Sequence, residues 1–244
     1  YIKTIDQVIT LEPCEGLLAC DSFGDGKMVN LDIIQLASES AFIFHKKKKF
    51  LTKDLKGIRF LVSAGPTVED LDAARQLTNR SSGRMGVLIA QAAKLRGAKV
   101  DLVHGPISLQ KDLLEGLNTY SVRTSSEMGA KINDLQPSSQ VIIMAAAISD
   151  FKKNSPSQEK VSKELFLKSI FNDLEMTPDL IKNQTRKKLD NQIFLGFAAE
   201  TGKNSEIIEK GEKKRILKGC DLLMANPIDR VGQGFDENFN SGFL

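Results

Sequence analysis

The chain has 244 residues, is 41% hydrophobic and carries a formal net charge of +3. These values predict one large domain, or one domain with a piece of another, around a sizeable core. No apolar run approaches the ~20 residues that a membrane-spanning helix needs, and a small charge without any Trp gives no basis for nucleic-acid binding. Three cysteines and two isolated histidines indicate neither a disulfide framework nor a zinc site, so we expect a protein of the reducing cytoplasm.

Residues 1–41 are predicted to be an appendage to the main domain. Residues 16–28 are rich in glycine and lack periodicity, which predicts a shaped loop, and a helix is expected over residues 31–41. Because Tyr1 is not an initiator Met, we expect the chain to begin inside a longer protein, and the apolar end at Leu244 leaves a truncated C-terminus open.

Residues 42–56 are predicted to be a linker to a domain over residues 57–244. Four consecutive lysines at 46–49 repel one another and stay solvated. Contact with a membrane or with nucleic acid is the alternative for this run, although four lysines alone are weak evidence for it.

From residue 57 onward, short apolar runs alternate with helical patterns. Gly97 follows the first helix, and Thr124 with Glu127 forms a capping box at the start of the second. This alternation with short loops predicts an α/β fold, a doubly wound, mostly parallel Rossmann-like sheet with helices on both faces. Strands are expected over residues 58–63, 100–103, 120–123, 141–146, 193–197 and 222–225, and helices over residues 83–96, 128–135 and 205–218.

The distinctive motifs of the chain follow these strands. They are residues 65–67, 146–150 and 198–200, and Asn226. Ligands of doubly wound sheets bind at the carboxyl ends of the strands. The motifs should therefore converge on one site.

Residues 77–86 are the stretch around which that site is organised. Ser81 or Ser82 suits a helix N-cap, and Gly83 lets backbone N–H groups approach a ligand closely. Free N–H groups and the positive end of the helix dipole together form an anion site. A capped helix after an ordinary loop is the alternative interpretation.

Two lysine-bearing segments could serve the same site. Residues 151–163 are polar and form either a solvated loop or a mobile lid that closes Lys160 over a triphosphate. Lys214 and Lys218 stand four residues apart on one face of a helix, which indicates either a solvated basic helix end or a pair of phosphate contacts.

Taken together, the motifs resemble a known family. Residues 64–70, 77–86, 105–106, 145–150 and 196–201, with Ala225 and Asn226, are similar to phosphopantothenoylcysteine synthetase. This enzyme is the ligase half of the bacterial coenzyme A biosynthesis bifunctional proteins. The resemblance covers about residues 57–240.

The resemblance implies a two-step ligation in coenzyme A biosynthesis. The carboxylate of 4′-phosphopantothenate attacks the α-phosphorus of CTP and releases pyrophosphate, and the amine of L-cysteine then displaces CMP from the acyl-cytidylate. Mg²⁺ is expected with the nucleotide, although the metal ligands are unknown. Such chemistry depends on orientation and charge neutralisation and needs no side-chain nucleophile.

The resemblance also assigns roles to individual residues. Asn79 and Lys160 are the implied catalytic residues. The implied substrate-binding residues are Arg75, Asn79, Ser81, Ser82, Gly83 and Met85. The implied nucleotide-binding residues are Gly65, Thr67, Ala146, Ala147, Asp150, Lys160, Phe197, Lys214, Lys218 and Asn226.

Two phrases depart from the family pattern. The flap usually reads Lys-Ile-Lys-Lys, whereas residues 160–163 have Ser162 at the third position. Thr177 stands where Asn is usual, and we expect it still to cap the helix that follows Pro178.

The appendage is similar to the C-terminal substrate-recognition clamp of phosphopantothenoylcysteine decarboxylase, and the catalytic cysteine of that clamp matches Cys20. Asp21 replaces the usual Gly, and we expect its carboxylate to raise the pKa of the Cys20 thiol. An ordinary loop with a free thiol is the alternative. The FMN-binding domain and the active-site His of that enzyme are not found in the sequence, so we expect neither flavin binding nor decarboxylation by this chain alone.

The family implies a ligase dimer, with decarboxylase trimers when the two enzymes are fused, and the clamp favours CTP over ATP. Two rival functions stay open, an NAD(P)-dependent oxidoreductase and a non-catalytic regulatory or scaffold protein. Against the oxidoreductase, residues 64–67 lack the Gly-x-Gly-x-x-Gly pattern, and no acidic residue ends the second strand.

Overall fold

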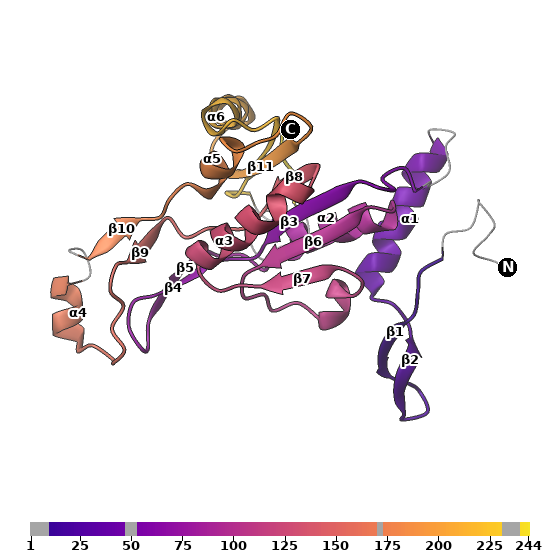
Figure 1. Ribbon diagram of the computed structural model, residues 1–244, viewed down its shortest axis with the longest axis horizontal. Coiled ribbons are helices and arrows are strands. Elements are labelled where there is room, and N and C mark those ends of the chain that lie inside the picture. Colours follow the sequence, from indigo (N-terminus) through magenta and orange to yellow (C-terminus); the bar gives the residue numbers. More distant parts are fainter. Residues whose placement is uncertain (1–9, 47–52, 170–172, 231–239) are drawn as a thin grey trace.

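A six-stranded parallel sheet forms the centre of the protein in the computed structural model, which describes residues 10–46, 53–169, 173–230 and 240–244. The strand order is β12-β11-β8-β3-β6-β7 (Figure 1). The strands are β3 (Arg59–Ala64), β6 (Lys99–His104), β7 (Asn118–Ser121), β8 (Val141–Met144), β11 (Ile193–Glu200) and β12 (Leu222–Pro227).

The chain winds outward from the middle of this sheet in both directions. It runs from β3 to β6 and β7, returns to β8 on the other side of β3, and continues to β11 and β12. Every neighbouring pair is parallel. The order therefore reverses between β3 and β8, where a doubly wound sheet opens a crevice at the carboxyl ends of its strands.

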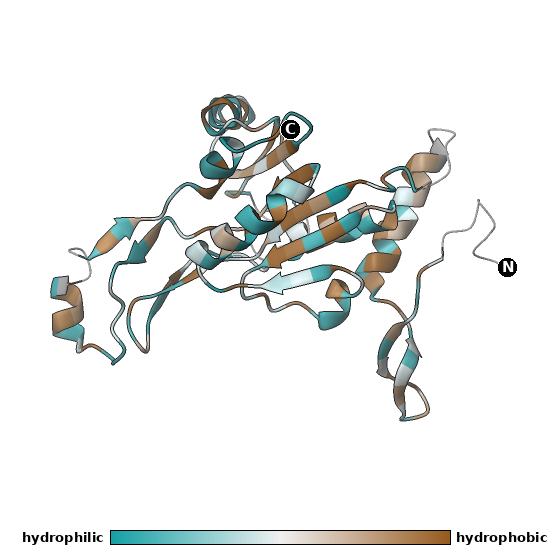
Figure 2. Ribbon diagram, in the orientation of Figure 1, coloured by the Kyte–Doolittle hydropathy of each residue, from teal (hydrophilic) through white to brown (hydrophobic). Residues whose placement is uncertain are grey.

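Helices cover both faces of the sheet, as predicted. Side chains of β3 alternate between two cores: Val62 packs on one face against Val87 of α2 (Arg84–Leu95), and Leu61 packs on the other. Figure 2 shows these apolar strands between more polar helices. The remaining body elements are α3 (Ser125–Leu135), α5 (Leu180–Thr185), α6 (Asn204–Lys218) and the 3₁₀ helices η2 (Lys111–Leu114) and η3 (Gln136–Ser138).

An arm projects from the carboxyl side of the sheet (Figure 1). It contains two antiparallel pairs and one helix: β4 (Val68–Asp70) with β5 (Gln76–Thr78), β9 (Phe151–Lys153) with β10 (Leu174–Met176), and α4 (Lys163–Ser169). Residues 64–82 and 151–163 are thus not plain loops. The sequence did not predict these strands, because three residues are too few to show an alternating hydrophobic pattern. In addition, β9 pairs with a segment that is distant in sequence.

The N-terminal part also differs from expectation. Residues 16–28 contribute to a hairpin of β1 (Cys14–Leu17) and β2 (Phe23–Lys27) rather than a loop. Helix α1 (Leu31–Lys46) continues past residue 41, so the predicted boundary between appendage and linker falls inside one helix. Residues 47–49 of the lysine run lie outside the described residues. Within the described ranges, no helix has the length and apolar content to cross a membrane.

Candidate active site

A cavity of about 1420 Å³ opens at the carboxyl ends of β8, β11 and β12. It lies where the strand order reverses, so its position is the one that the doubly wound topology favours for a ligand. Most of the predicted site residues line it. They are Asn79, Ser81, Ser82, Gly83, Met85, Ala146, Ala147, Asp150, Phe197, Lys214, Lys218 and Asn226.

The loop before α2 has the geometry of an anion site. Gly83 is the residue at the N-cap, with φ 78°. The prediction that Ser81 or Ser82 caps the helix is therefore wrong. The hydroxyl oxygens of Ser81 and Ser82 instead accept hydrogen bonds from the N–H groups of Gly83 and Arg84, both at 3.3 Å. Their hydroxyl hydrogens stay available to donate to an anion, beside the first N–H groups of the helix.

Gly65 and Thr67 lie behind the cavity wall and do not line it. A Cβ on Gly83 would lie 3.1 Å from the Cα of Gly65, so the two glycines allow close contact between β3 and the loop. The Thr67 hydroxyl accepts from the N–H of Ser149 at 2.9 Å, and its carbonyl accepts from Thr78. Both residues hold the wall in shape.

Asn79 is fixed at the edge of the cavity. Its side-chain Nδ2 donates to the carbonyl of Ile148 at 2.7 Å, in the segment that follows β8. The N–H groups of Ala146 and Ala147 are used within the protein, bonding to Ser63 and Gly65 respectively. A nucleobase at this wall would meet the carbonyl groups and apolar surfaces of Ala146 and Ala147.

Two lysines of α6 present ammonium groups on the opposite wall. Lys214 Nζ lies 2.5 Å from Glu200 Oε1, and Lys218 Nζ lies 3.7 Å from Asp179 Oδ2. Glu200 is buried at the end of β11, so its carboxylate needs the cation beside it. These pairs hold both lysines at the cavity.

The sequence interpretation missed part of the wall. Residues 176–181 line the cavity, and Asp179 rather than Thr177 caps α5, accepting from the N–H of Lys182 at 3.0 Å. Thr177 Oγ1 is buried without a hydrogen-bond partner in the described residues. The pairing of β9 with β10 and the hydrogen bond from the Thr177 N–H to the Asp150 carbonyl bring this segment to the cavity, and no local signal predicts these contacts.

Arg75 and Lys160 are not brought to the cavity. Arg75 fastens the arm, because its guanidinium bonds to Asp72 and to the carbonyl of Val161 and stacks on the Phe166 ring at 4.1 Å. Burial alone would raise the pKa of Asp72, but backbone N–H groups, chiefly that of Ala74, together with Arg75 lower it. Lys160 is exposed next to this cluster.

Cys20 lies in the exposed turn of the N-terminal hairpin, away from the cavity. Its Sγ is 3.0 Å from the hydroxyl of Ser22, and this hydrogen bond lowers the pKa of the thiol. The expectation that Asp21 raises this pKa is therefore wrong. Among the described residues, no group of three or more His, Cys, Asp or Glu side chains could hold a metal ion.

The fold and the cavity define a doubly wound α/β protein whose cavity at the topological switch point is lined by a serine-glycine loop and two lysines. The chain belongs to the family described as the DNA/pantothenate metabolism flavoprotein C-terminal domain, whose sequence profile matches residues 55–244.

Two bacterial relatives share one name. The coenzyme A biosynthesis bifunctional protein CoaBC of Vibrio cholerae is 32% identical over 233 residues, covering 96% of this chain and 55% of that protein. The protein of the same name from Escherichia coli K12 is 34% identical over 236 residues, covering 94% and 54%. The crystal structure of a CoaBC C-terminal domain superposes with a TM-score of 0.59 at 32% identity, covering 72% of this chain and 80% of that one. The chain thus spans about half the length of the curated relatives it matches.

Proposed function

We propose that this chain is a phosphopantothenate–cysteine ligase that uses CTP and releases CMP and pyrophosphate. One observation carries the proposal: a single cavity gathers the serine-glycine loop, Asn79, Asp150 and the lysine pair of α6. Membership of the family and the names of the relatives support the assignment to coenzyme A biosynthesis.

In the first step, a carboxylate oxygen of 4′-phosphopantothenate forms a bond to the α-phosphorus of CTP while the bond to the β-phosphate oxygen breaks. Negative charge grows on the departing pyrophosphate. Lys214 and Lys218 are placed to neutralise it, and Asp150 is placed to accept hydrogen bonds from the ribose hydroxyls. Lys160 joins them when the arm brings it to a cavity. Preorganised charges of this kind are the main source of rate enhancement in such chemistry.

In the second step, the amine of L-cysteine attacks the acyl carbonyl, the bond to the CMP oxygen breaks, and the amine loses a proton. Asn79 is held by its bond to the Ile148 carbonyl, and its amide oxygen is left to accept a hydrogen bond from the incoming amine. We propose that Mg²⁺ enters with the triphosphate, since Mg²⁺ commonly binds through substrate phosphates and one or two carboxylates rather than an all-protein cage.

We further propose a homodimeric ligase of the cytoplasm. Large apolar side chains are exposed on the arm, which suits a surface covered by a second copy. They are Phe151, Leu165, Leu167 and Met176. In a full-length protein, the N-terminal residues would serve as the clamp of an FMN-dependent decarboxylase, with Cys20 as its proton donor, and trimers would join the dimers.

The test is an assay of the chain with CTP, 4′-phosphopantothenate and L-cysteine, following pyrophosphate and CMP separately. We expect both products only when all three substrates and Mg²⁺ are present, and faster turnover with CTP than with ATP. Binding of NADPH without binding of CTP would instead support the oxidoreductase.

A further inference from the structure

Helix α1 precedes the residues that the family profile matches, yet it forms one wall of the cavity. Asp32, Gln35, Leu36 and Glu39 line the same space as the serine-glycine loop. Ile33, 5% exposed, belongs to the core that also contains Val87 and Ala90 of α2, and Ala37 is buried to the same degree. Burial of this kind makes α1 a part of the ligase body.

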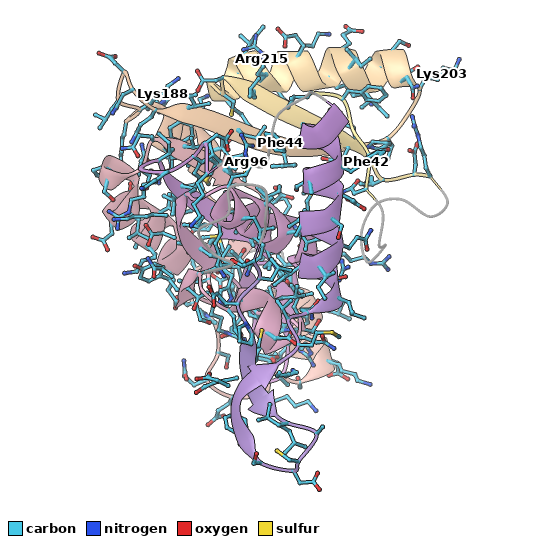
Figure 3. All side chains as sticks on the ribbon, turned by 90° about the vertical axis from the view of Figure 1, so that its right-hand side faces the viewer. Phe42, Phe44, Arg96, Lys188, Lys203 and Arg215 are labelled. Atoms are coloured by element: carbon cyan, nitrogen blue, oxygen red, sulfur yellow. The ribbon has the colours of Figure 1, made fainter. Side chains whose placement is uncertain are left out.

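Polar contacts fix both ends of α1. At its start, the Asn30 side chain accepts from the N–H of Asp32 at 2.9 Å and donates to Gln110 and Asp112. Near its end, Phe44 lies over the guanidinium of Arg96, with Cζ 5.8 Å from the ring centre (Figure 3). The cavity-facing residues of α1 therefore have a defined position.

The contact that links α1 to the chemistry is an ion pair. Arg84 Nη2 donates to Asp32 Oδ1 at 2.7 Å, and both side chains line the cavity. Arg84 is the first residue of α2 and follows the Gly83 turn directly. Its Nε is buried and has no hydrogen-bond partner in the described residues, so a ligand in the cavity would be met by the terminal nitrogens of the guanidinium.

The position of Arg84 indicates which anion it would meet. Helix α2 packs on β3 and β6, whereas α6 with Lys214 and Lys218 packs on β11 and β12. Strand β8 lies between these pairs, so the arginine and the lysines flank the switch point from opposite sides. A triphosphate at the lysines leaves Arg84 beside the other substrate.

We propose that Arg84 binds the phosphate monoester of the acyl substrate, and that Asp32 of α1 is a positioning residue that holds the guanidinium in place. This inference rests on the proposed function. It makes α1 a working part of the ligase site rather than a spacer.

The first test is calorimetric titration of Arg84→Gln with three ligands: 4′-phosphopantothenate, unphosphorylated pantothenate and CTP. Loss of a charged hydrogen bond should weaken 4′-phosphopantothenate about 10- to 100-fold. Binding of pantothenate and of CTP should match the unsubstituted protein. Arg96→Gln is the matched control, because it removes an arginine from the same helix, an ion pair of 2.6 Å and a contact with α1, all away from the cavity.

The second test concerns Asp32. Asp32→Ala should raise the KM for 4′-phosphopantothenate and leave kcat unchanged, and Asp32→Asn should restore most of the loss because its amide oxygen still accepts from Arg84. A merely structural role would instead lower the melting temperature without separating KM from kcat.

The outcomes distinguish the two proposals. If the unsubstituted chain binds neither CTP nor 4′-phosphopantothenate, the proposed function fails. If it binds both and Arg84→Gln binds 4′-phosphopantothenate normally, the inference about Arg84 alone fails. An equal loss of CTP binding would place Arg84 in the triphosphate site and overturn the inference as well.

Discussion

The lysines of the proposed site belong to two regions that hold them differently. Lys214 and Lys218 extend from α6, which packs on β11 and β12, and each has a carboxylate beside it. Lys160 lies exposed in the arm, which is built from three-residue strands and a short helix. Sheet packing places the first pair at the cavity of its own chain, whereas the arm does not place Lys160 there.

The N-terminal hairpin behaves like the arm. Cys20 is exposed, and the contact that sets its chemistry is a hydrogen bond to Ser22, two residues away. In the body, tertiary packing therefore sets the position of a functional side chain. In the arm and the hairpin, local contacts set it, together with whatever surface the projecting part reaches. Substitutions in the two kinds of region should have different signatures.

The largest effect is expected from the arm. Lys160→Gln keeps the length of the side chain and removes its charge, so it should slow CTP-dependent pyrophosphate release ~10²- to 10³-fold. The melting temperature should not change, because Lys160 is exposed. Single-turnover assays of pyrophosphate and CMP measure the effect. Lys152→Gln is the control on the same arm, since Lys152 pairs with Glu175 at 2.9 Å and should retain activity.

Asn79→Asp separates the two half-reactions. It keeps the shape of the side chain but replaces the NH₂ that donates to the Ile148 carbonyl with a charged oxygen, so the side chain loses its anchor. Pyrophosphate should still be released while acyl-cytidylate accumulates. If Lys160→Gln and Asn79→Asp slow both steps in equal proportion, the two residues do not divide the chemistry in this way.

The body lysine should show a mixed effect. Lys214→Gln removes a phosphate contact and leaves the Glu200 carboxylate, 8% exposed, without its cation. We expect a loss of activity smaller than that of Lys160→Gln, together with a destabilisation of about 1–3 kcal/mol. Thermal unfolding at pH 7 measures the second part. An unchanged melting temperature would show that the body pair is no better anchored than the arm lysine.

Substitution of the glycine before α2 should affect both stability and binding. A Cβ on Gly83, at φ 78°, would lie 2.5 Å from Ile107 Cγ2, so Gly83→Ala should cost about 1–3 kcal/mol and weaken CTP or 4′-phosphopantothenate. Gly97→Ala is the control at the other end of the same helix, with φ 90° and a contact of 2.8 Å to Lys53. Similar destabilisation of both, with weaker binding in Gly83→Ala alone, is the expected result by calorimetry.

The body was predictable because its signals are local and periodic. Apolar runs located all six strands of the sheet to within a few residues, and Thr124 with Glu127 forms the predicted capping box. Motifs at strand ends converge because parallel strands share one carboxyl edge. The lining residues that follow the strands, Ala146, Ala147, Asp150 and Asn226, were therefore expected at one site, and the family resemblance supplied their roles.

The remaining features depend on contacts between distant segments. Nothing near Thr177 indicates that β10 pairs with β9, and nothing near Asp32 indicates that α1 packs on α2. The position of Lys160 outside the cavity likewise depends on the direction of the arm. The Asp21 expectation failed because the hydroxyl of Ser22 bonds to the Cys20 thiol and lowers its pKa, although Asp21 is the nearer residue in sequence.

The smallest expected effect tests the local control of Cys20. Its lowered pKa increases the thiolate fraction at neutral pH, so a thiol reagent should label Cys20 before the buried Cys14, whose pKa is raised to about 11. Ser22→Ala removes the hydrogen bond, raises the pKa and should slow labelling at pH 7 by about two- to fivefold. The rate of labelling, followed against pH by intact-mass spectrometry, gives the midpoint of the Cys20 titration.

Asp21→Asn is the matched control, because Asn tolerates the φ of 58° found at this position and lacks the charge. We expect no shift of the midpoint in Asp21→Asn. A lower midpoint in Asp21→Asn, with none of the expected change in Ser22→Ala, would show that the carboxylate controls the thiol after all.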